Sequence, residues 1–215
     1  MLQQMNEMKD YLANLDGKIK GTLRLGVSQT YARYKLPTIL AKFITEYPEV
    51  EIKLKSGFSY EVIQMINKEE ANIGIVRDAY DWKGSKILLN KEKIYLVSKD
   101  KIDIDQLPNL TRIDYNTDLS LKNTIDAWWK ESFDHPPKNT MEVDLIDTCR
   151  EMVLNGLGYS FLPEICLKGC NNLYTYELYL HNENLVRNTW LIFHKQSLDL
   201  SVVKAFVEFI EKEKA

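Results

Sequence analysis

Two kinds of segment follow one another along this chain. Short segments place apolar residues at every second position, as strands do, and longer segments place them at the spacing of a helix. Residues 22–27 alternate apolar and other side chains, and a polar turn separates them from a helical stretch at 31–47. A second alternating segment at 50–54, a helical stretch at 61–68 and a short apolar run at 73–76 follow. Strands that alternate with helices predict an α/β fold in which both faces of a mostly parallel sheet are covered.

The same pattern returns in the second half of the chain. The expected strands there are 94–98, 110–113, 139–143, 159–162, 173–180 and 190–194, and the expected helices are 121–133, 145–155 and 202–212. Two similar α/β units joined by chain crossovers are therefore predicted. A cleft between them is the expected ligand site, because small-molecule pockets favour domain interfaces and the carboxyl ends of parallel strands.

The first residues carry a different signal. Met5, Met8, Leu12, Leu15 and Ile19 recur at heptad spacing, which is typical of a helix that packs against a partner helix. An amphipathic helix packed on its own domain is the alternative.

Composition narrows the function classes. A formal net charge of -3, with no basic stripe, argues against direct nucleic-acid binding by this part of the chain. The odd number of cysteines, three, favours reduced thiols, and their spacing does not suit a zinc site. The start shows no secretory signal and the chain has no long apolar run, so we expect a cytoplasmic location without membrane contact. No metal or other cofactor is expected.

Catalytic patterns are missing from the sequence. His135, His181 and His194 stand in separate contexts without a neighbouring nucleophile, and motifs for hydrolases, nucleotide triphosphatases, zinc proteases and dinucleotide binding do not occur. We therefore do not expect an enzyme.

Two segments contain residues that could bind an anion. Ser28, Gln29 and Thr30 form a polar turn between a strand and a helix, where hydroxyls, an amide and helix-terminal N–H groups can converge on one negative group. Arg77 directly follows the apolar strand at 73–76, and its guanidinium could hold a carboxylate from the end of that strand. The alternative for Arg77 is a surface residue paired with Asp78 or Asp81.

Three motifs follow one another along the chain: GTLRLGVSQTYARYKLPTILAKFITEYPEVEIKL, KSGFSYEVIQMINKEEANIGIVR and EMVLNGLGYSFLPE. In this order they resemble the effector domain of LysR-type transcription regulators, and the resemblance covers residues 18–215. It implies a two-lobed, periplasmic-binding-protein-like fold of type II. Lobe I would comprise 20–97 and 195–215, and lobe II 98–194, with crossovers near Ser98 and His194. Residues 1–19 would then be the end of a linker and dimerisation helix, and the winged helix-turn-helix head that precedes it in the family is absent from this sequence.

The resemblance also implies site residues. Ser28, Gln29 and Thr30 match the family's first binding turn, Ser59 its second polar turn, and Arg77 the position after its third strand. Asp144 matches a further site position but departs from the small polar residue often found there, and an acid would repel an anionic effector unless it is paired or protonated.

A subgroup resemblance suggests the ligand. IDTCREMVLNGLGYSFLPEI and LVRNTWLIFHKQSLDL are similar to stretches of citrate-responsive catabolite control regulators, in which the arginine matching Arg187 helps bind the tricarboxylate. Arg77 and Arg187 are thus a candidate pair of clamps for citrate.

The predicted function is effector sensing for transcription control of metabolic genes, as a homodimer or homotetramer that reaches promoter DNA only through the missing head. The first alternative is a solute-binding protein that delivers a small anion to a transporter. The second is an enzyme on the same frame, similar to prephenate dehydratase or porphobilinogen deaminase.

Overall fold

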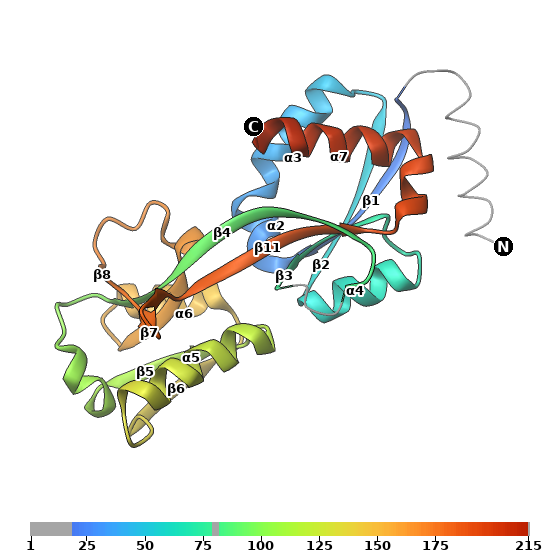
Figure 1. The fold of residues 1–215 in the computed structure, drawn as a ribbon. Helices are drawn as coiled ribbons and strands as arrows, with labels where there is room; N and C mark the ends of the chain where they lie inside the picture. Colours follow the sequence, from blue (N-terminus) through green and yellow to red (C-terminus); the bar gives the residue numbers. More distant parts are fainter. Residues whose placement is uncertain (1–18, 79–81, 215) are drawn as a thin grey trace. The chain divides into compact units, whose positions relative to one another are not determined.

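The fold is described from a computed structural model for residues 19–78 and 82–214 (Figure 1). The predicted linker helix at 1–19 lies outside the described residues except for its last position, and so does Asp81. Both predicted crossovers, near Ser98 and His194, lie within the described residues.

Strands and helices alternate as the sequence predicts. The strands are β1 (Gly21–Ser28), β2 (Val50–Gly57), β3 (Ile73–Arg77), β4 (Ser85–Ser98), β5 (Thr111–Tyr115), β6 (Asn139–Val143), β7 (Tyr159–Pro163), β8 (Tyr174–Glu177), β9 (Tyr179–Leu180), β10 (Glu183–Asn184) and β11 (Val186–Phe193). The helices are α2 (Gln29–Tyr34), α3 (Leu36–Glu46), α4 (Ser59–Asn67), α5 (Leu119–Ser132), α6 (Ile146–Leu154) and α7 (Ser201–Lys214), with short 3-10 turns η1 (Ile104–Asn109), η2 (Glu164–Leu167) and η3 (Lys195–Asp199).

The sheet is mostly parallel at its two ends and antiparallel where the long strands enter. Its strand order is β2-β1-β3-β11-β4-β7-β5-β6, with β8 paired to β4. β1 runs parallel to β2 and β3, and β5 runs parallel to β6 and β7. β11 is antiparallel to β3, and β4 is antiparallel to β7 and β8. The predicted α/β class is confirmed.

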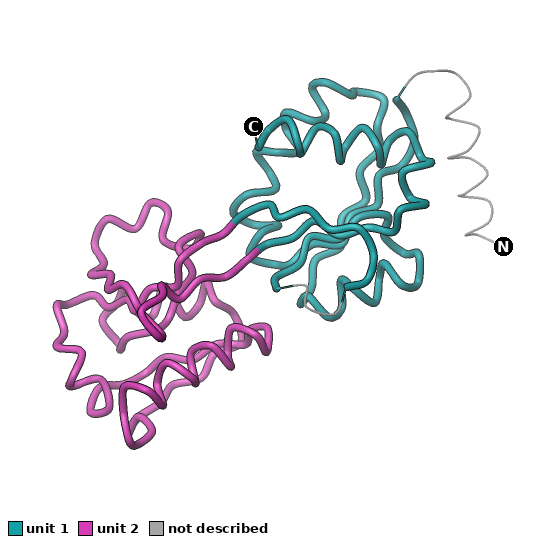
Figure 2. The backbone as a smooth tube through the Cα atoms, viewed as in Figure 1, with its two compact units in different colours: residues 1–90, 189–215 teal, residues 91–188 magenta. Residues whose placement is uncertain are grey.

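The chain divides into two compact units (Figure 2). Unit 1 holds the chain up to Asn90 and again from Thr189, and unit 2 holds Lys91–Asn188. Both boundaries therefore fall earlier in the sequence than the predicted crossovers. They lie inside the continuous strands β4 and β11, where no turn residue marks the change of unit.

In unit 1, helices cover both faces of the sheet (Figure 1). On one face α4 packs so closely that a Cβ on Gly26 would lie 3.2 Å from Val62 Cγ1. On the other face α3 and α7 pack together, and the rings of Phe43 and Phe206 meet edge to face at 5.0 Å. These layers hold the strand ends of unit 1 in fixed positions, since a close-packed interior resists displacement.

In unit 2, α5 and α6 take the same roles. Trp128 of α5 packs edge to face on Phe161 of β7, with ring centroids 5.5 Å apart. A second cluster joins Cys149 and Val153 of α6 to Val97 and Ile113 of the sheet. All three cysteines are free thiols, and Cys149 and Cys166 are buried.

Candidate functional site

Three parallel strands of unit 1 end at the same edge. Ser28 is the last residue of β1 and lies in register with Gly57, the last residue of β2. On the other side of β1, Val27 pairs with Ile75 of β3, which ends two residues later at Arg77. The carboxyl ends of parallel strands are where ligands of α/β proteins bind.

Ser28 is the most unusual residue of this edge. It is only 3% exposed, and its hydroxyl has no hydrogen-bond partner among the described residues. It also makes no side-chain cap on the helix that follows it. A buried hydroxyl without a partner costs about 1–3 kcal/mol, so a bound group that formed a hydrogen bond with it would offset this cost.

Arg77 is buried at the end of β3. Its guanidinium donates from Nη1 to Thr189 Oγ1 of β11, and its carbon Cζ lies 5.9 Å from the centre of the Tyr31 ring. Its backbone N–H donates to Ser59 Oγ at 2.9 Å. These contacts from β11, α2 and α4 fix the arginine.

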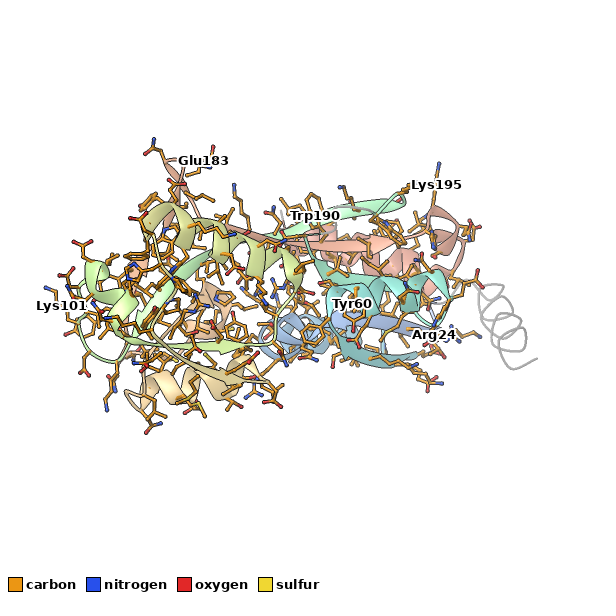
Figure 3. The ribbon with its side chains drawn as sticks, turned by 90° about the horizontal axis from the view of Figure 1, so that it is seen from below. Arg24, Tyr60, Lys101, Glu183, Trp190 and Lys195 are labelled. Atoms are coloured by element: carbon orange, nitrogen blue, oxygen red, sulfur yellow. The ribbon has the colours of Figure 1, made fainter. Side chains whose placement is uncertain are left out.

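The other residues of the first turn are less enclosed. Gln29 is exposed and Thr30 is partly buried, both in the six-residue helix α2. Tyr60, labelled in Figure 3, marks the first turn of α4 next to Ser59 and is 66% exposed. The structure therefore gathers Ser28, Ser59 and Arg77 at one sheet edge, and it adds Tyr31 and Thr189, which the sequence analysis did not single out.

Arg187 lies in unit 2 with a different partner. Its Nε and Nη2 donate to Glu92 Oε1 at 3.3 and 3.2 Å, and the two side chains are 3% and 2% exposed. The other oxygen of Glu92, Oε2, accepts from the backbone N–H of Ile165 at 3.1 Å. Arg187 and Glu92 thus form a buried, hydrogen-bonded ion pair between β11 and β4.

Asp144, the remaining predicted residue, is exposed in the bend between β6 and α6 in unit 2. Unit 2 also contains a polar cavity of about 290 Å³ between α5 and the sheet. Its charged lining residues are Arg112, Asp114, Lys122, Asp126 and Glu142, and Arg112 is already bound through Nε and Nη2 to Asp114 Oδ2.

Residues 19–78 and 82–214 offer neither a metal site nor a membrane-spanning helix. No group of three or more His, Cys, Asp or Glu side chains there is placed to hold a metal ion. None of the helices between residues 19 and 214, outside the gap at 79–81, is long and apolar enough to cross a membrane.

Two mixed α/β units linked through long antiparallel strands, with polar groups at parallel strand ends, define a ligand-binding module of the type II periplasmic-binding-protein-like class. Residues 16–215 match the family described as "LysR substrate binding domain". The chain belongs to this family, and the family predicted from the sequence is confirmed.

Similar proteins with known names support this family assignment. The chain is 44% identical over 214 residues to the uncharacterized HTH-type transcriptional regulator YraN of Bacillus subtilis, covering 99% of this chain and 74% of that protein. It is 31% identical over 211 residues to YkuM of the same organism, covering 97% and 72%. The chain is therefore the effector-binding domain of a LysR-type transcriptional regulator, and the solute-binding alternative is not favoured.

Solved structures share the fold. The C-terminal domain of a probable LysR family regulator from Rhodococcus sp. RHA1 superposes with a TM-score of 0.75 at 16% identity, covering 90% of this chain and all of that one. The cofactor-binding domain of the Cbl transcriptional regulator gives 0.74 at 20% identity, covering 89% and 88%. The reduced form of the regulatory domain of OxyR2 from Vibrio vulnificus gives 0.72 at 18% identity, covering 91% and 96%.

Proposed function

We propose that the domain senses a small anionic metabolite, which binds at the carboxyl edge of the unit 1 sheet against Arg77. The observation that carries the proposal is the buried Ser28 hydroxyl without a partner among the described residues, on the same edge as the buried Arg77 guanidinium. A hydroxyl donates to an anion and a guanidinium forms charge-assisted, often bidentate, bonds with carboxylates and similar oxyanions.

Each residue has a different role in the proposed site. Arg77 supplies charge, and the Ser28 hydroxyl supplies a directional donor. Tyr31, Thr189 and Ser59 hold the arginine in place. Gln29 and Thr30, at the start of α2, would contact the outer part of the effector. An effector present at millimolar concentration needs only about 4 kcal/mol of net binding free energy, which a few such contacts supply.

Citrate, which the subgroup resemblance suggests, is one candidate effector, and small mono- and dicarboxylates are others. In the citrate hypothesis Arg187 and Asp144 would join the site. Arg187 would act as a second clamp, although its pairing with Glu92 opposes that role.

The effector would change transcription only by favouring one arrangement of the protein over another. We propose that it shifts the packing of a homodimer or homotetramer, and that DNA is bound through an N-terminal head of the longer regulator. A full-length structure of one similar protein, CbnR, is a complex with its target DNA, and the chain covers 75% of it at a TM-score of 0.71 and 13% identity.

Calorimetric titration with acetate, succinate, citrate, sulfate and phosphate tests the proposal. At least one anion should bind saturably, and Arg77→Met should abolish that binding in a protein with an unchanged circular dichroism spectrum. Lys83→Met, a change of an exposed cation in the same unit, is the matched control and should bind normally. An anion that binds equally well to Arg77→Met would contradict the proposed site.

A further inference from the structure

Unit 2 contains a polar cavity of its own. The cavity has a volume of about 290 Å³ and lies between α5 and the strands β5, β6 and β7. All of its lining residues belong to unit 2, so it includes no residue of the proposed effector site in unit 1. Its size lies at the lower end of the range of small-molecule sites, which also combine a cavity with a few convergent polar groups.

The sheet face beneath α5 is charged. β5 and β6 run parallel, and Arg112 of β5 is in register with Thr140 of β6. Two residues further along, Asp114 is in register with Glu142 on the same face, and all four side chains line the cavity. The strands of a parallel sheet that is covered by helices are normally apolar. The charged residues on this covered face therefore need another explanation, and a polar ligand supplies one.

Two of the charged residues bind each other. Arg112 donates to Asp114 Oδ2 from Nε at 3.1 Å and from Nη2 at 2.9 Å. The Arg112 guanidinium carbon also lies 5.3 Å from the centre of the Trp129 ring. These contacts hold the arginine in place and neutralise its charge, so this pair forms part of the wall of the cavity.

Three further charged groups face the cavity without such a partner. The side chains of Lys122, Asp126 and Glu142 form no hydrogen bond or ion pair with any residue in the ranges 19–78 and 82–214. Lys122 and Asp126 lie four residues apart on α5 and so share one face of the helix. Glu142 belongs to the opposite wall, which the sheet forms. The three groups supply one positive and two negative charges to a ligand.

This charge pattern matches an amino acid. The ligand ammonium can bind Asp126 and Glu142, and the ligand carboxylate can bind Lys122, so both charged ends have a partner of opposite sign. A simple anion would meet two carboxylates of its own sign, and a simple amine would leave Lys122 unused. Ile125 and Phe161 also line the cavity and offer apolar surface to the ligand side chain.

We infer that unit 2 binds a small α-amino acid with an apolar side chain in this cavity, as a second ligand site of the domain. Lys122 binds the carboxylate, and Asp126 and Glu142 bind the ammonium. The ligand differs from the effector proposed for unit 1, because this site requires a positive charge that a simple anion lacks.

Calorimetric titration with L-leucine, isoamylamine and isocaproate tests the inference. Isoamylamine is leucine without its carboxylate, and isocaproate is leucine without its ammonium. Leucine should bind saturably, and about tenfold or more tightly than isoamylamine. Asp126→Asn/Glu142→Gln and Lys122→Met should each weaken leucine binding about tenfold or more. Asp134→Asn and Lys101→Met change exposed charges of unit 2 outside the cavity, and these matched controls should bind leucine like wild type.

Two results would overturn the inference. One is leucine binding that is equally tight in wild type and in folded Asp126→Asn/Glu142→Gln, and the other is no saturable binding of leucine to wild type up to about 10 mM. Isocaproate should bind wild type and the double variant equally, because it lacks the ammonium.

Nuclear magnetic resonance of the wild type decides the matter if a variant does not fold. Leucine should shift the amide signals of Asn116 and Ser160, which line the cavity. Saturable binding that leaves both signals unmoved would place leucine elsewhere and overturn the inference.

Discussion

The Ser59 hydroxyl oxygen accepts a 2.9 Å hydrogen bond from the backbone N–H of Arg77, and both residues are buried. Ser59 begins α4 and Arg77 ends β3, so this bond fixes a helix start to a strand end. It sets the point from which the Arg77 side chain leaves the sheet. The same serine therefore contributes to folding and to the placement of the guanidinium.

Ser59→Ala should lower the free energy of unfolding by about 1–2 kcal/mol, because the Arg77 N–H then stays buried without this acceptor. Urea unfolding measures the change. Ser56→Ala, at an exposed position of β2, is the matched control and should change stability by less than about 0.5 kcal/mol. Equal effects of the two substitutions would show that the Ser59 bond is unimportant.

Arg187→Ala and Glu92→Ala should each cost about 3–5 kcal/mol, because each leaves the other charge buried alone. Replacement of both by alanine should cost much less than the sum of the two single replacements. Glu208→Ala removes the exposed partner of Lys204 and should change stability by less than about 0.5 kcal/mol. Additive single and double effects in urea unfolding would mean that the pair has no coupling.

Gly158→Ala should be strongly destabilising. A Cβ there would lie 2.3 Å from the carbonyl oxygen of Thr111, so β5 and β7 would have to separate. Gly169→Ala is the control, since nothing lies within 4 Å of the added carbon and its positive φ of 79° costs only about 1 kcal/mol. A smaller loss of thermal stability for Gly158→Ala than for Gly169→Ala would contradict this packing.

Stability should fall in alkaline solution. Burial raises the pKa of the Cys149 thiol to about 11, and burial likewise raises the pKa of the Tyr115 and Tyr159 hydroxyls. These groups ionise at lower pH in the unfolded chain than in the folded one. Their contribution is complete below the unfolded pKa values and is lost as the pH rises through the interval up to the folded values.

Urea unfolding between neutral pH and about pH 10.5 should therefore show a declining free energy of unfolding from about pH 9 upward. Tyr115→Phe should show a shallower decline than wild type, because one ionisable group is gone. An unchanged decline in Tyr115→Phe would remove this tyrosine from the explanation.

Periodicity was sufficient to predict most of the strands and helices. The alternating segments at 22–27, 50–54 and 73–76 became β1, β2 and β3 with small changes at their ends. β4 was expected only at 94–98, but it begins at Ser85, because its first half is partly exposed and lacks a continuous apolar run. The expected helix at 31–47 is divided at Lys35, and Pro37 lies in the first turn of its second part.

The sequence predicted those residues of the candidate site that are polar and stand at the end of an apolar strand. Ser28 and Arg77 end apolar strands, and Ser59 belongs to a motif of the family. Thr189 and Glu92 give no such local signal, because each acts through a partner that is distant in sequence: Thr189 binds Arg77 and Glu92 binds Arg187. Only the pairing of β11 with β3 and β4 brings these side chains together.

The central claim is that an anionic effector binds against Arg77 at the carboxyl edge of unit 1. Nuclear magnetic resonance of the ¹⁵N-labelled chain, titrated with the anion that calorimetry selects, tests it most directly. We predict saturable shifts of the Arg77 side-chain Nε–Hε signal and of the Ser28 and Ser59 amide signals. Shifts confined to the unit 2 cavity around Arg112 and Lys122, with the Arg77 signal unmoved, would contradict it.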